Sequence, residues 1–414
     1  MSTLGMGVRL LGDLVPDAHL DGQEDEWVTI REFCERSHPA DVVAAAREIQ
    51  VWLDEGTDEE HLLEVYLDAG ANTAPDEGEP LRAYLERIRD YLLGFGAQRV
   101  GRAVGAHPGL PADLVAWVVR ELGDRGLAWL SELPGLVETA VARWDLTVGE
   151  PVSSHRSLVL AVMQSGGEPA VLRAAFRGWP ESCAVPSLEA WGGNGAARLL
   201  ADDPVAGVCL LERATPGAAL RGLVPTDDVK ATEVVGALLG RLWRAEPPVV
   251  ELPGLDAYPP PFATYLDVHG GRGPLPQALV VDAERVLDEL LASSDESGPP
   301  VLLHGNLHHG NVLSSDSHPG GWVAVDPRGM LGDRCYDLAA MLRQPTPWVG
   351  QHDDLGALLR RRLYQLSSQL GVDEDRARAW GFVTSVRAEV ERVAATGTPH
   401  GTPLRVAEAL RRQM

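Results

Sequence analysis

Lysine is almost absent from this chain. Of its 414 residues only Lys230 is a lysine, and the other 35 basic residues are arginines. Any mechanism that needs a lysine ammonium group must therefore use Lys230 or rely on arginine, whose planar guanidinium carries the same charge in a different geometry. Lys230 itself falls within a helical pattern, after the strands described below.

Long apolar runs, a basic leader and paired cysteines are also missing. No stretch of about 18 apolar residues occurs, and the first residues lack the basic and apolar segments of a signal peptide. The four cysteines, Cys34, Cys183, Cys209 and Cys335, are scattered, which is typical of buried thiols in a reducing compartment. We therefore expect a soluble, cytoplasmic protein.

Positive charge is scarce. The 36 Lys and Arg residues face 60 Asp and Glu residues, which gives a net charge of −24 and a pI near 4.8. This balance argues against nucleic acid and anionic membrane surfaces, because both bind basic patches. It suits a cationic small-molecule substrate or ligand, although an acidic surface more often serves solubility alone.

The acidic residues are concentrated near the N-terminus. Residues 1–100 hold 22 Asp and Glu against 8 Arg. Apolar residues recur at helical spacing over 39–53, 58–69 and 81–93. We therefore predict a small all-α domain over residues 1–98. The Gly-, Ala- and Arg-rich residues 94–109 indicate a flexible linker, which we place at 99–109.

Strand patterns follow a further helical stretch. Residues 157–163 and 169–175 flank a Gln-Ser-Gly-Gly turn, which is typical of a β-hairpin, and residues 209–213 read as a third apolar strand. Helical patterns dominate from Val229 onward. The order of strands first and helices afterwards predicts an α+β domain over residues 110–414, with an N-lobe at about 110–215 and a C-lobe at about 216–414.

Two short segments of the C-lobe carry the residues that point to chemistry. His304-Gly-Asn-Leu-His-His-Gly-Asn311 follows one predicted strand, 301–304, and Asp326-Pro-Arg-Gly329 ends a second, 322–326. Magnesium takes oxygen ligands, often one or two carboxylates together with phosphates. We therefore expect Asn311 and Asp326 to hold a metal ion, the alternative for Asp326 being a turn-forming residue before proline.

The three histidines of this loop offer a second possibility. His304, His308 and His309 suggest a zinc site, but zinc needs a third and fourth ligand at defined spacing, and the sequence shows none. We expect His304 to support the loop by hydrogen bonding.

The two segments resemble the catalytic loop and the metal-binding strand of small-molecule kinases. Residues 107–414 are similar to the aminoglycoside/hydroxyurea antibiotic resistance kinase family, of the streptomycin 6-phosphotransferase type. Beside the two segments, the match rests on Trp144-Asp-Leu146, Ala170-Val-Leu-Arg173, Trp191–Leu200, Leu210–Arg213 and Gly332–Ala339. The resemblance implies a two-lobed, protein-kinase-like fold and Mg-ATP-dependent phosphorylation of a hydroxyl on an aminoglycoside-like molecule.

The chain departs from the family's catalytic set. Arg173 stands where the resemblance implies a phosphate-binding lysine, and Ala184 stands near its glutamate partner. Asn306 occupies the position of the catalytic aspartate, and an amide cannot take the acceptor's proton. Arg328 replaces a further lysine. An engineered Asp-to-Asn change would explain Asn306 alone. Because the implied lysine–glutamate ion pair is also altered, at Arg173 and Ala184, we favour a natural loss of the catalytic set.

The N-terminal domain has a weaker resemblance of its own. Residues 24–94 resemble the helical immunity proteins of contact-dependent growth inhibition systems, through Glu26-Trp27, Glu48–Leu53, Thr57–Glu60 and Leu81–Leu85. Three functions therefore stay open: an active antibiotic kinase, a weak or inactive pseudokinase that retains its ligand site, and an immunity or regulatory protein that binds a protein partner.

Overall fold

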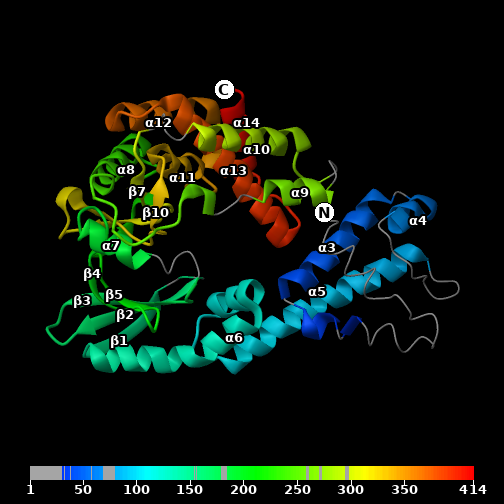
Figure 1. Cartoon of the computed structure of the whole chain (residues 1–414), viewed down its shortest axis with the longest axis horizontal. Coiled ribbons are helices and arrows are strands. Elements are labelled where there is room, and N and C mark those ends of the chain that lie inside the picture. Colours follow the sequence, from blue (N-terminus) through cyan, green and yellow to red (C-terminus); the bar gives the residue numbers. More distant parts are fainter. Residues whose placement is uncertain are drawn as a thin grey trace. The chain divides into compact units, whose positions relative to one another are not determined.

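A computed structural model of the chain describes residues 30–31, 33–37, 39–56, 58–68, 80–152, 154, 156–178, 184–257, 261–269, 273–293 and 298–414. The chain splits into two compact units. The first takes in Met1–Gly135, Ser153–Leu158 and Thr264–Gly273, and the second takes in Leu136–Val152, Val159–Ala263 and Pro274–Met414. Figure 1 labels the helices and strands of both units.

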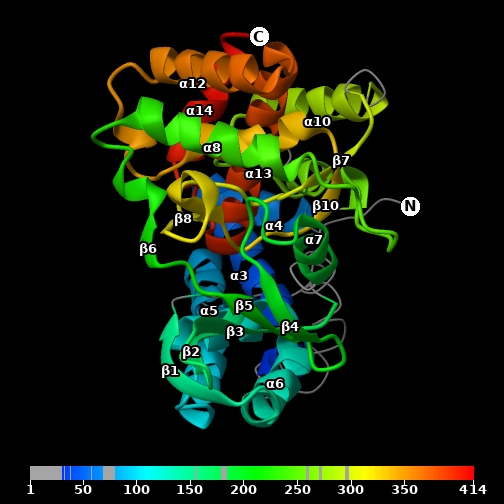
Figure 2. The ribbon, with the colours of Figure 1, turned by 90° about the vertical axis from the view of Figure 1, so that its left-hand side faces the viewer.

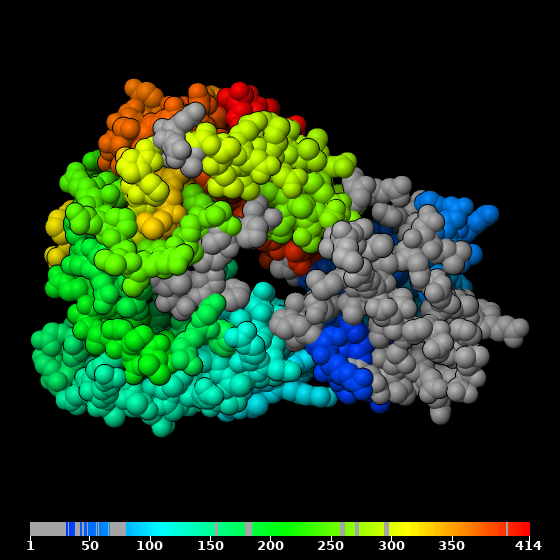
Figure 3. Space-filling model, in the orientation of Figure 1, coloured from blue at the N-terminus to red at the C-terminus, as the bar shows by residue number. Residues whose placement is uncertain are grey.

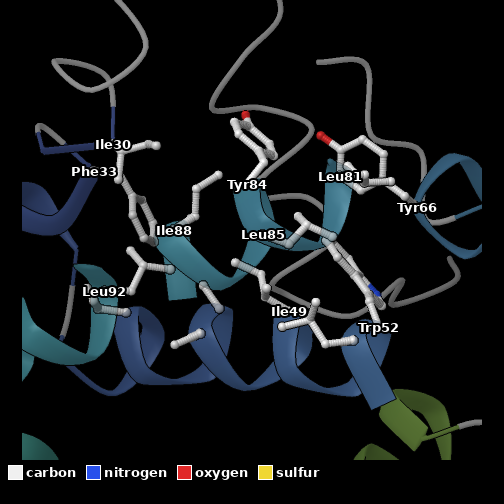
Figure 4. Packing of buried hydrophobic residues seen from close by; sticks show 14 of the residues in the cluster. Ile30, Phe33, Ile49, Trp52, Tyr66, Leu81, Tyr84, Leu85, Ile88 and Leu92 are labelled. Carbon is white, nitrogen blue, oxygen red and sulfur yellow. The ribbon is translucent and has the colours of Figure 1, made fainter. Parts of the chain in front are cut away.

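Three amphipathic helices build the core of the first unit: α3 (Pro39–Glu55), α4 (Glu59–Asp68) and α5 (Leu81–Ala106). Figure 4 shows Ile49 and Trp52 of α3 against Leu85 and Ile88 of α5. Tyr66 of α4 meets Trp52 edge to face, with ring centroids 5.9 Å apart. All five side chains are buried, because each lies on the apolar stripe of its helix. The three predicted helices are confirmed.

The stretch predicted as a flexible linker is helical, because α5 runs without a break to Ala106. Alanine, arginine and glutamine favour the helix, and the glycines cost only about 1 kcal/mol each relative to alanine. A Cβ added at Gly94, Gly101 or Gly105 would meet nothing within 4 Å, so these glycines mark an open helix face. The domain boundaries on either side of this stretch stay predictions.

The next helix, α6 (Ala112–Arg143), is interrupted once. Gly123 has a φ of 55° and a ψ of −135°, a conformation that only glycine adopts without strain. Helical structure on both sides of this break confirms the helical patterns predicted before Trp144.

A five-stranded sheet forms the N-lobe of the second unit. Its strands are β1 (Leu146–Val152), β2 (Ser157–Gln164), β3 (Pro169–Ala175), β4 (Leu199–Asp203) and β5 (Val208–Glu212), in the order β1-β2-β3-β5-β4. The neighbouring β2 and β3 confirm the predicted hairpin, and β5 confirms the third strand. The short helix α7 (Ala184–Trp191) lies between β3 and β4 in the sequence. The strands β1 and β4 were not predicted.

Helices make up most of the C-lobe. They are α8 (Asp228–Leu242), α9 (Phe262–His269), α10 (Gln277–Ala292), α11 (Ala339–Arg343), α12 (Leu355–Leu370), α13 (Glu374–Thr396) and α14 (Thr402–Arg411), of which α9 falls mainly in the first unit. The central helix α13 packs against α10, α11, α12 and α14. Figure 2 shows the five-stranded sheet on one side of these helices, and Figure 3 shows α10, α12 and α14 along their outer surface.

The C-lobe also contains two small sheets. The strand β7 (Val301–Leu303) pairs with β10 (Met330–Gly332), and β6 (Pro216–Ala219), β8 (Val312–Ser315) and β9 (Trp322–Ala324) form the other sheet. Both predicted strands of the C-lobe exist, as β7 and β9. They lie in separate sheets, where β7 pairs with β10 and β9 pairs with β8. Neither β8 nor β10 was predicted. The α+β, two-lobed architecture is confirmed.

Two expectations concern the chain as a whole. Among the described helices, none has the length and apolar character needed to cross a membrane. Cys34, Cys209 and Cys335 are buried free thiols, as predicted, whereas Cys183 lies outside the described residues.

Candidate functional site

The loop from His304 to Asn311 connects β7 to β8, and a buried carboxylate holds its first turn. Asp337 accepts hydrogen bonds from the backbone N–H groups of His304 (3.0 Å) and Gly305 (2.7 Å), and from the Trp243 indole N–H (3.2 Å). Burial raises the pKa of Asp337 to about 6, although these three donors favour its charged form. Asp337 thus fixes where the loop leaves the strand.

His304 supports the loop from within. Its Nε2 lies 3.1 Å from the carbonyl oxygen of Val325, and its Nδ1 accepts the backbone N–H of Asn306 at 3.3 Å. The ring stacks on Trp191 of α7, with centroids 6.2 Å apart. Burial lowers the pKa of His304 to about 3, so the ring stays neutral. The predicted supporting role is confirmed.

Asp326 follows β9 and meets two polar side chains. An Arg173 guanidinium nitrogen lies 3.3 Å from Oδ1 of Asp326. The Asn306 amide nitrogen donates to Oδ2 of Asp326 and to its backbone oxygen, both at 3.2 Å. These contacts bring Arg173, Asn306 and Asp326 together. They also show that Asn306 acts as a hydrogen-bond donor toward this carboxylate.

Asn311 ties the end of the loop to the same region. Its amide nitrogen donates to the backbone oxygen of Asn306 (3.0 Å), and its backbone oxygen accepts the N–H of Val325 (2.9 Å). The loop therefore places Asn311 beside Val325, the residue between β9 and Asp326. One carboxylate and one amide oxygen are the kinds of donor that magnesium combines with phosphates.

Arg173 has a different partner from the one that a kinase lysine would have. It lies within β3, 6% exposed, opposite Cys209 of β5. Ala184, the first residue of α7, is buried and offers no charge, and the carboxylate of α7, Glu189, is exposed. Asp326 is a counter-ion of this buried guanidinium, at 3.3 Å.

Lys230 does not replace Arg173. It lies on α8, more than half exposed, and its ammonium pairs with Glu233 at 3.0 Å. Within the described ranges, no three His, Cys, Asp or Glu side chains are placed to share a metal ion.

Sequence reasoning missed Asp337, Trp191 and Trp243. The first two lie within stretches that carried the family resemblance, Gly332–Ala339 and Trp191–Leu200, and that match was the available signal. Trp243 had no signal, because only the tertiary structure brings the end of α8 to Asp337.

Comparison with known proteins supports a phosphotransferase. The model of the aminoglycoside/hydroxyurea antibiotic resistance kinase family matches residues 143–394. A streptomycin 6-kinase of Streptomyces glaucescens is 33% identical over 281 residues, which cover 66% of this chain and 87% of that protein. A hydroxyurea phosphotransferase of Kitasatospora aureofaciens is 35% identical over 318 residues, which cover 73% of this chain and 87% of that protein. A streptomycin 3''-kinase of Klebsiella pneumoniae is 35% identical over 207 residues, which cover 49% of this chain and 71% of that protein.

Proposed function

The chain belongs to the aminoglycoside/hydroxyurea antibiotic resistance kinase family, and on this premise we propose that it is a pseudokinase. In this proposal the site binds a nucleotide and a small molecule, but it transfers a phosphoryl group weakly or not at all. The observation that carries the proposal is the contact of Asn306 with Asp326, in which the amide donates a hydrogen bond at the catalytic position.

The amide at position 306 removes the general base. In kinases an aspartate of the catalytic loop orients the acceptor hydroxyl and accepts its proton. The Asn306 side chain has no basic lone pair, and its N–H group already points to Asp326. General-base catalysis contributes about 10²- to 10⁴-fold to a rate, so this substitution alone makes the reaction slow.

The ion pair between Arg173 and Asp326 adds a second obstacle. To contact nucleotide phosphates, the guanidinium must give up part of its interaction with Asp326 at 3.3 Å. No glutamate from α7 holds Arg173 in a phosphate-binding position, since Ala184 is the residue at that point. Transition-state positioning is the main catalytic contribution of a kinase, so a misplaced cation lowers the rate further.

Asn311 and Asp326 are the residues that would hold magnesium. Magnesium supplies positive charge that neutralises the phosphates of a bound nucleotide. Within the chain, Asp326 provides the charged oxygen, Asn311 the neutral oxygen, and Arg173 the second cation. Because these residues are present, we propose that Mg-ATP binding survives the loss of efficient transfer.

The alternative within the family is an active kinase. The related proteins are named for streptomycin and hydroxyurea, and an active form of this chain would phosphorylate a hydroxyl of a comparable small molecule. A cationic ligand matches the net charge of −24.

Two measurements separate the pseudokinase from the active kinase. Mg-ATP should raise the melting temperature of the chain, since a ligand of the native state stabilises it, while streptomycin-dependent ATP turnover should stay far below the ~1–100 s⁻¹ that is typical of kinases. Turnover of the unaltered chain within that range would refute the proposal.

Variants then locate the defect. If only the base is missing, Asn306→Asp should raise turnover by about 10²- to 10⁴-fold. If the ion pair matters as well, turnover should rise only when Arg173→Lys and Ala184→Glu are added, and the three effects should be strongly non-additive.

We also propose a second role, protein binding by the N-terminal helices. The separate apolar core around Trp52 and Leu85 supports it, because a domain with its own core can present a surface independently of the kinase-like unit. Limited proteolysis should release a stable fragment that contains α3, α4 and α5. Loss of all helical structure after cleavage near Gly109 would count against this role.

A further inference from the structure

We propose that Trp191, the last residue of α7, positions the loop from His304 to Asn311 against Asp326. It acts through the imidazole ring of His304 and is therefore a positioning residue. The proposal deepens the proposed function and rests on it, since it names the side chain that keeps the magnesium-binding residues in place.

Trp191 lies on the buried face of α7. The buried residues of this helix share one face, at a spacing of three and four residues, and are Ala184, Ser187, Leu188 and Trp191. The helix ends at Trp191, because Gly192 follows with a φ of 54° and donates its N–H to the backbone oxygen of Leu188 at 3.0 Å. The sequence thus places a large aromatic ring at the buried end of the helix.

The indole ring of Trp191 is held in one orientation. It is 3% exposed, and its Nε1–H donates to the backbone oxygen of Leu242, the last residue of α8, at 3.2 Å. The chain that follows α7 lies against the same helix end, since a Cβ built on Gly195 would be 3.2 Å from Cδ2 of Leu242. A buried indole whose N–H is bonded in this way offers a fixed surface to a neighbouring ring.

His304 is that neighbour. Its ring stacks on Trp191 with an angle of 21° between the planes and 6.2 Å between the centroids. His304 is fully buried, and both of its ring nitrogens have partners: Nδ1 accepts the N–H of Asn306, and Nε2 faces the backbone oxygen of Val325. Together these two bonds require the neutral ring with its proton on Nε2. Each bond depends on the ring orientation, which the stacking on Trp191 restricts.

The two bonds of His304 reach both halves of the candidate site. Asn306 occupies the catalytic position of the loop, and Val325 directly precedes Asp326. One ring therefore holds the loop at a set distance from the end of β9. Groups that orient metal-binding residues from behind typically contribute about 10- to 100-fold to metal affinity. Trp191 stands one step further back, because it fixes the ring that makes both bonds.

The chain after α7 holds the same strand through its backbone. The N–H of Ala324 donates to the backbone oxygen of Gly195, and the N–H of Ala197 donates to the backbone oxygen of Ala324, both at 2.9 Å. Ala324 ends β9, two residues before Asp326. The end of α7 is thus joined to β9 by main-chain bonds and to the loop by a side chain. Of these links, the side chain of Trp191 is the one that a substitution removes.

The start of α7 offers a different picture from its end. Ala184 carries no charge, so it cannot form an ion pair with Arg173. Trp191, seven residues later, contacts the ring that spans the loop and the strand. In this chain the contribution of α7 to the site therefore comes from its last residue.

Calorimetric titration of the full chain with Mg-ADP tests the proposal. Trp191→Leu removes the stacked ring and the indole N–H but keeps a buried apolar side chain, and it should weaken Mg-ADP binding by about 10- to 100-fold. Trp191→Phe keeps a ring against His304 and should weaken binding by less than about 10-fold. The control is Trp52→Leu, which removes a buried tryptophan of α3 in the first unit and should leave the affinity unchanged.

Hydrogen exchange of the ligand-free chain gives a second measurement that needs no nucleotide. Trp191→Leu should speed exchange at the amides of Asn306 and Val325 by about 10-fold or more, because the loop and the strand lose their shared support. Exchange within α12 should keep the parent rate, whereas a general loss of stability would speed it as well. Trp191→Met, whose flexible side chain fills irregular space, takes the place of Trp191→Leu if the latter does not fold.

Three results would overturn the proposal. They are unchanged exchange at Asn306 and Val325, an equal increase of exchange in α12, and a parent-like Mg-ADP affinity of Trp191→Leu. If the parent chain binds no Mg-ADP, the nucleotide-binding part of the pseudokinase proposal falls, and hydrogen exchange alone decides on Trp191. If the parent and Trp191→Leu bind Mg-ADP equally well and turnover stays low, only the positioning proposal falls.

Discussion

Restoring an acid at position 306 should destabilise the metal-free protein. In the structure the Asn306 amide nitrogen lies 3.2 Å from Oδ2 of Asp326, as donor to acceptor. Asn306→Asp turns this attraction into a contact of two carboxylates. Two like unit charges at this separation repel by about 1 kcal/mol in bulk water and about 5 kcal/mol at an effective dielectric constant of 20.

The expected loss lies in the lower part of that range. The Asp326 side chain is 48% exposed, so solvent screens it, and Arg173 at 3.3 Å offsets part of the repulsion. We expect the free energy of unfolding to fall by about 1–3 kcal/mol at pH 7.5 without metal. Magnesium should restore this loss, because a divalent cation between two carboxylates removes their repulsion.

The sign of the pH dependence gives an independent check. Repulsion raises the pKa of one carboxyl of the pair in the folded state, so the folded variant binds more protons than the unfolded one. The loss in stability should therefore be present at neutral pH and disappear as the pH falls toward about 4.

Urea unfolding of parent and variant, with and without magnesium, measures these effects. Gln98→Glu is the control, since it adds the same charge at an exposed position of α5, in the first unit. The reasoning fails if Asn306→Asp is as stable as the parent without metal, or if magnesium stabilises it no more than it stabilises Gln98→Glu.

Three further predictions concern buried groups of the second unit. Burial lowers the pKa of His304 to about 3 and that of His308 to about 4. Lowering the pH from 7 to 5 should therefore reduce the free energy of unfolding by about 2 kcal/mol for each histidine, as urea titrations at both pH values can show. Asp337, whose pKa burial raises to about 6, should offset about 1 kcal/mol of this loss. Trp191→Ala removes the ring stacked on His304 and should cost about 3–5 kcal/mol, whereas Trp191→Phe, which keeps an aromatic ring but loses the indole N–H bond and part of the buried volume, should cost about 1–2 kcal/mol in the same assay. Glu389, fully buried, accepts three backbone N–H groups at the start of α14, so Glu389→Gln should cost about 1.5–3 kcal/mol and speed hydrogen exchange there; unchanged exchange would contradict this.

Local patterns predicted much of the fold. Helical spacing located α3 and α4, and alternation around a Gly-rich turn located the β2–β3 hairpin, because both signals repeat within a few residues. The same reasoning failed at α5, where glycines at 94–105 suggested a linker. The helix propensities of the alanines, arginines and other residues of this stretch outweighed the cost of the glycines. This sum over many residues is not visible when single glycines are taken as breaks.

For the candidate site, too, some features follow from the sequence and others only from the tertiary structure. The sequence by itself determined the residue types: an amide at 306, a guanidinium at 173, a single lysine, and a loop and strand that match a kinase family. Only the tertiary structure decided that Arg173 pairs with Asp326, across 153 positions of sequence. The fold sets that distance by placing Arg173 on β3 and Asp326 just after β9, and residue identity alone carries no information about it.

The charges around His308 show the same limit. Composition gave a net charge of −24 and favoured a cationic ligand, because a sum over the chain contains no positions. Folding buries His308 and brings the charges of Arg343, Arg221 and Arg328 to bear on it, so that burial first and these charges second lower the pKa of its ring to about 4. Electrostatic energy depends on the distance between charges, so the sequence determined which charges this protein has, and the tertiary structure decided where they act.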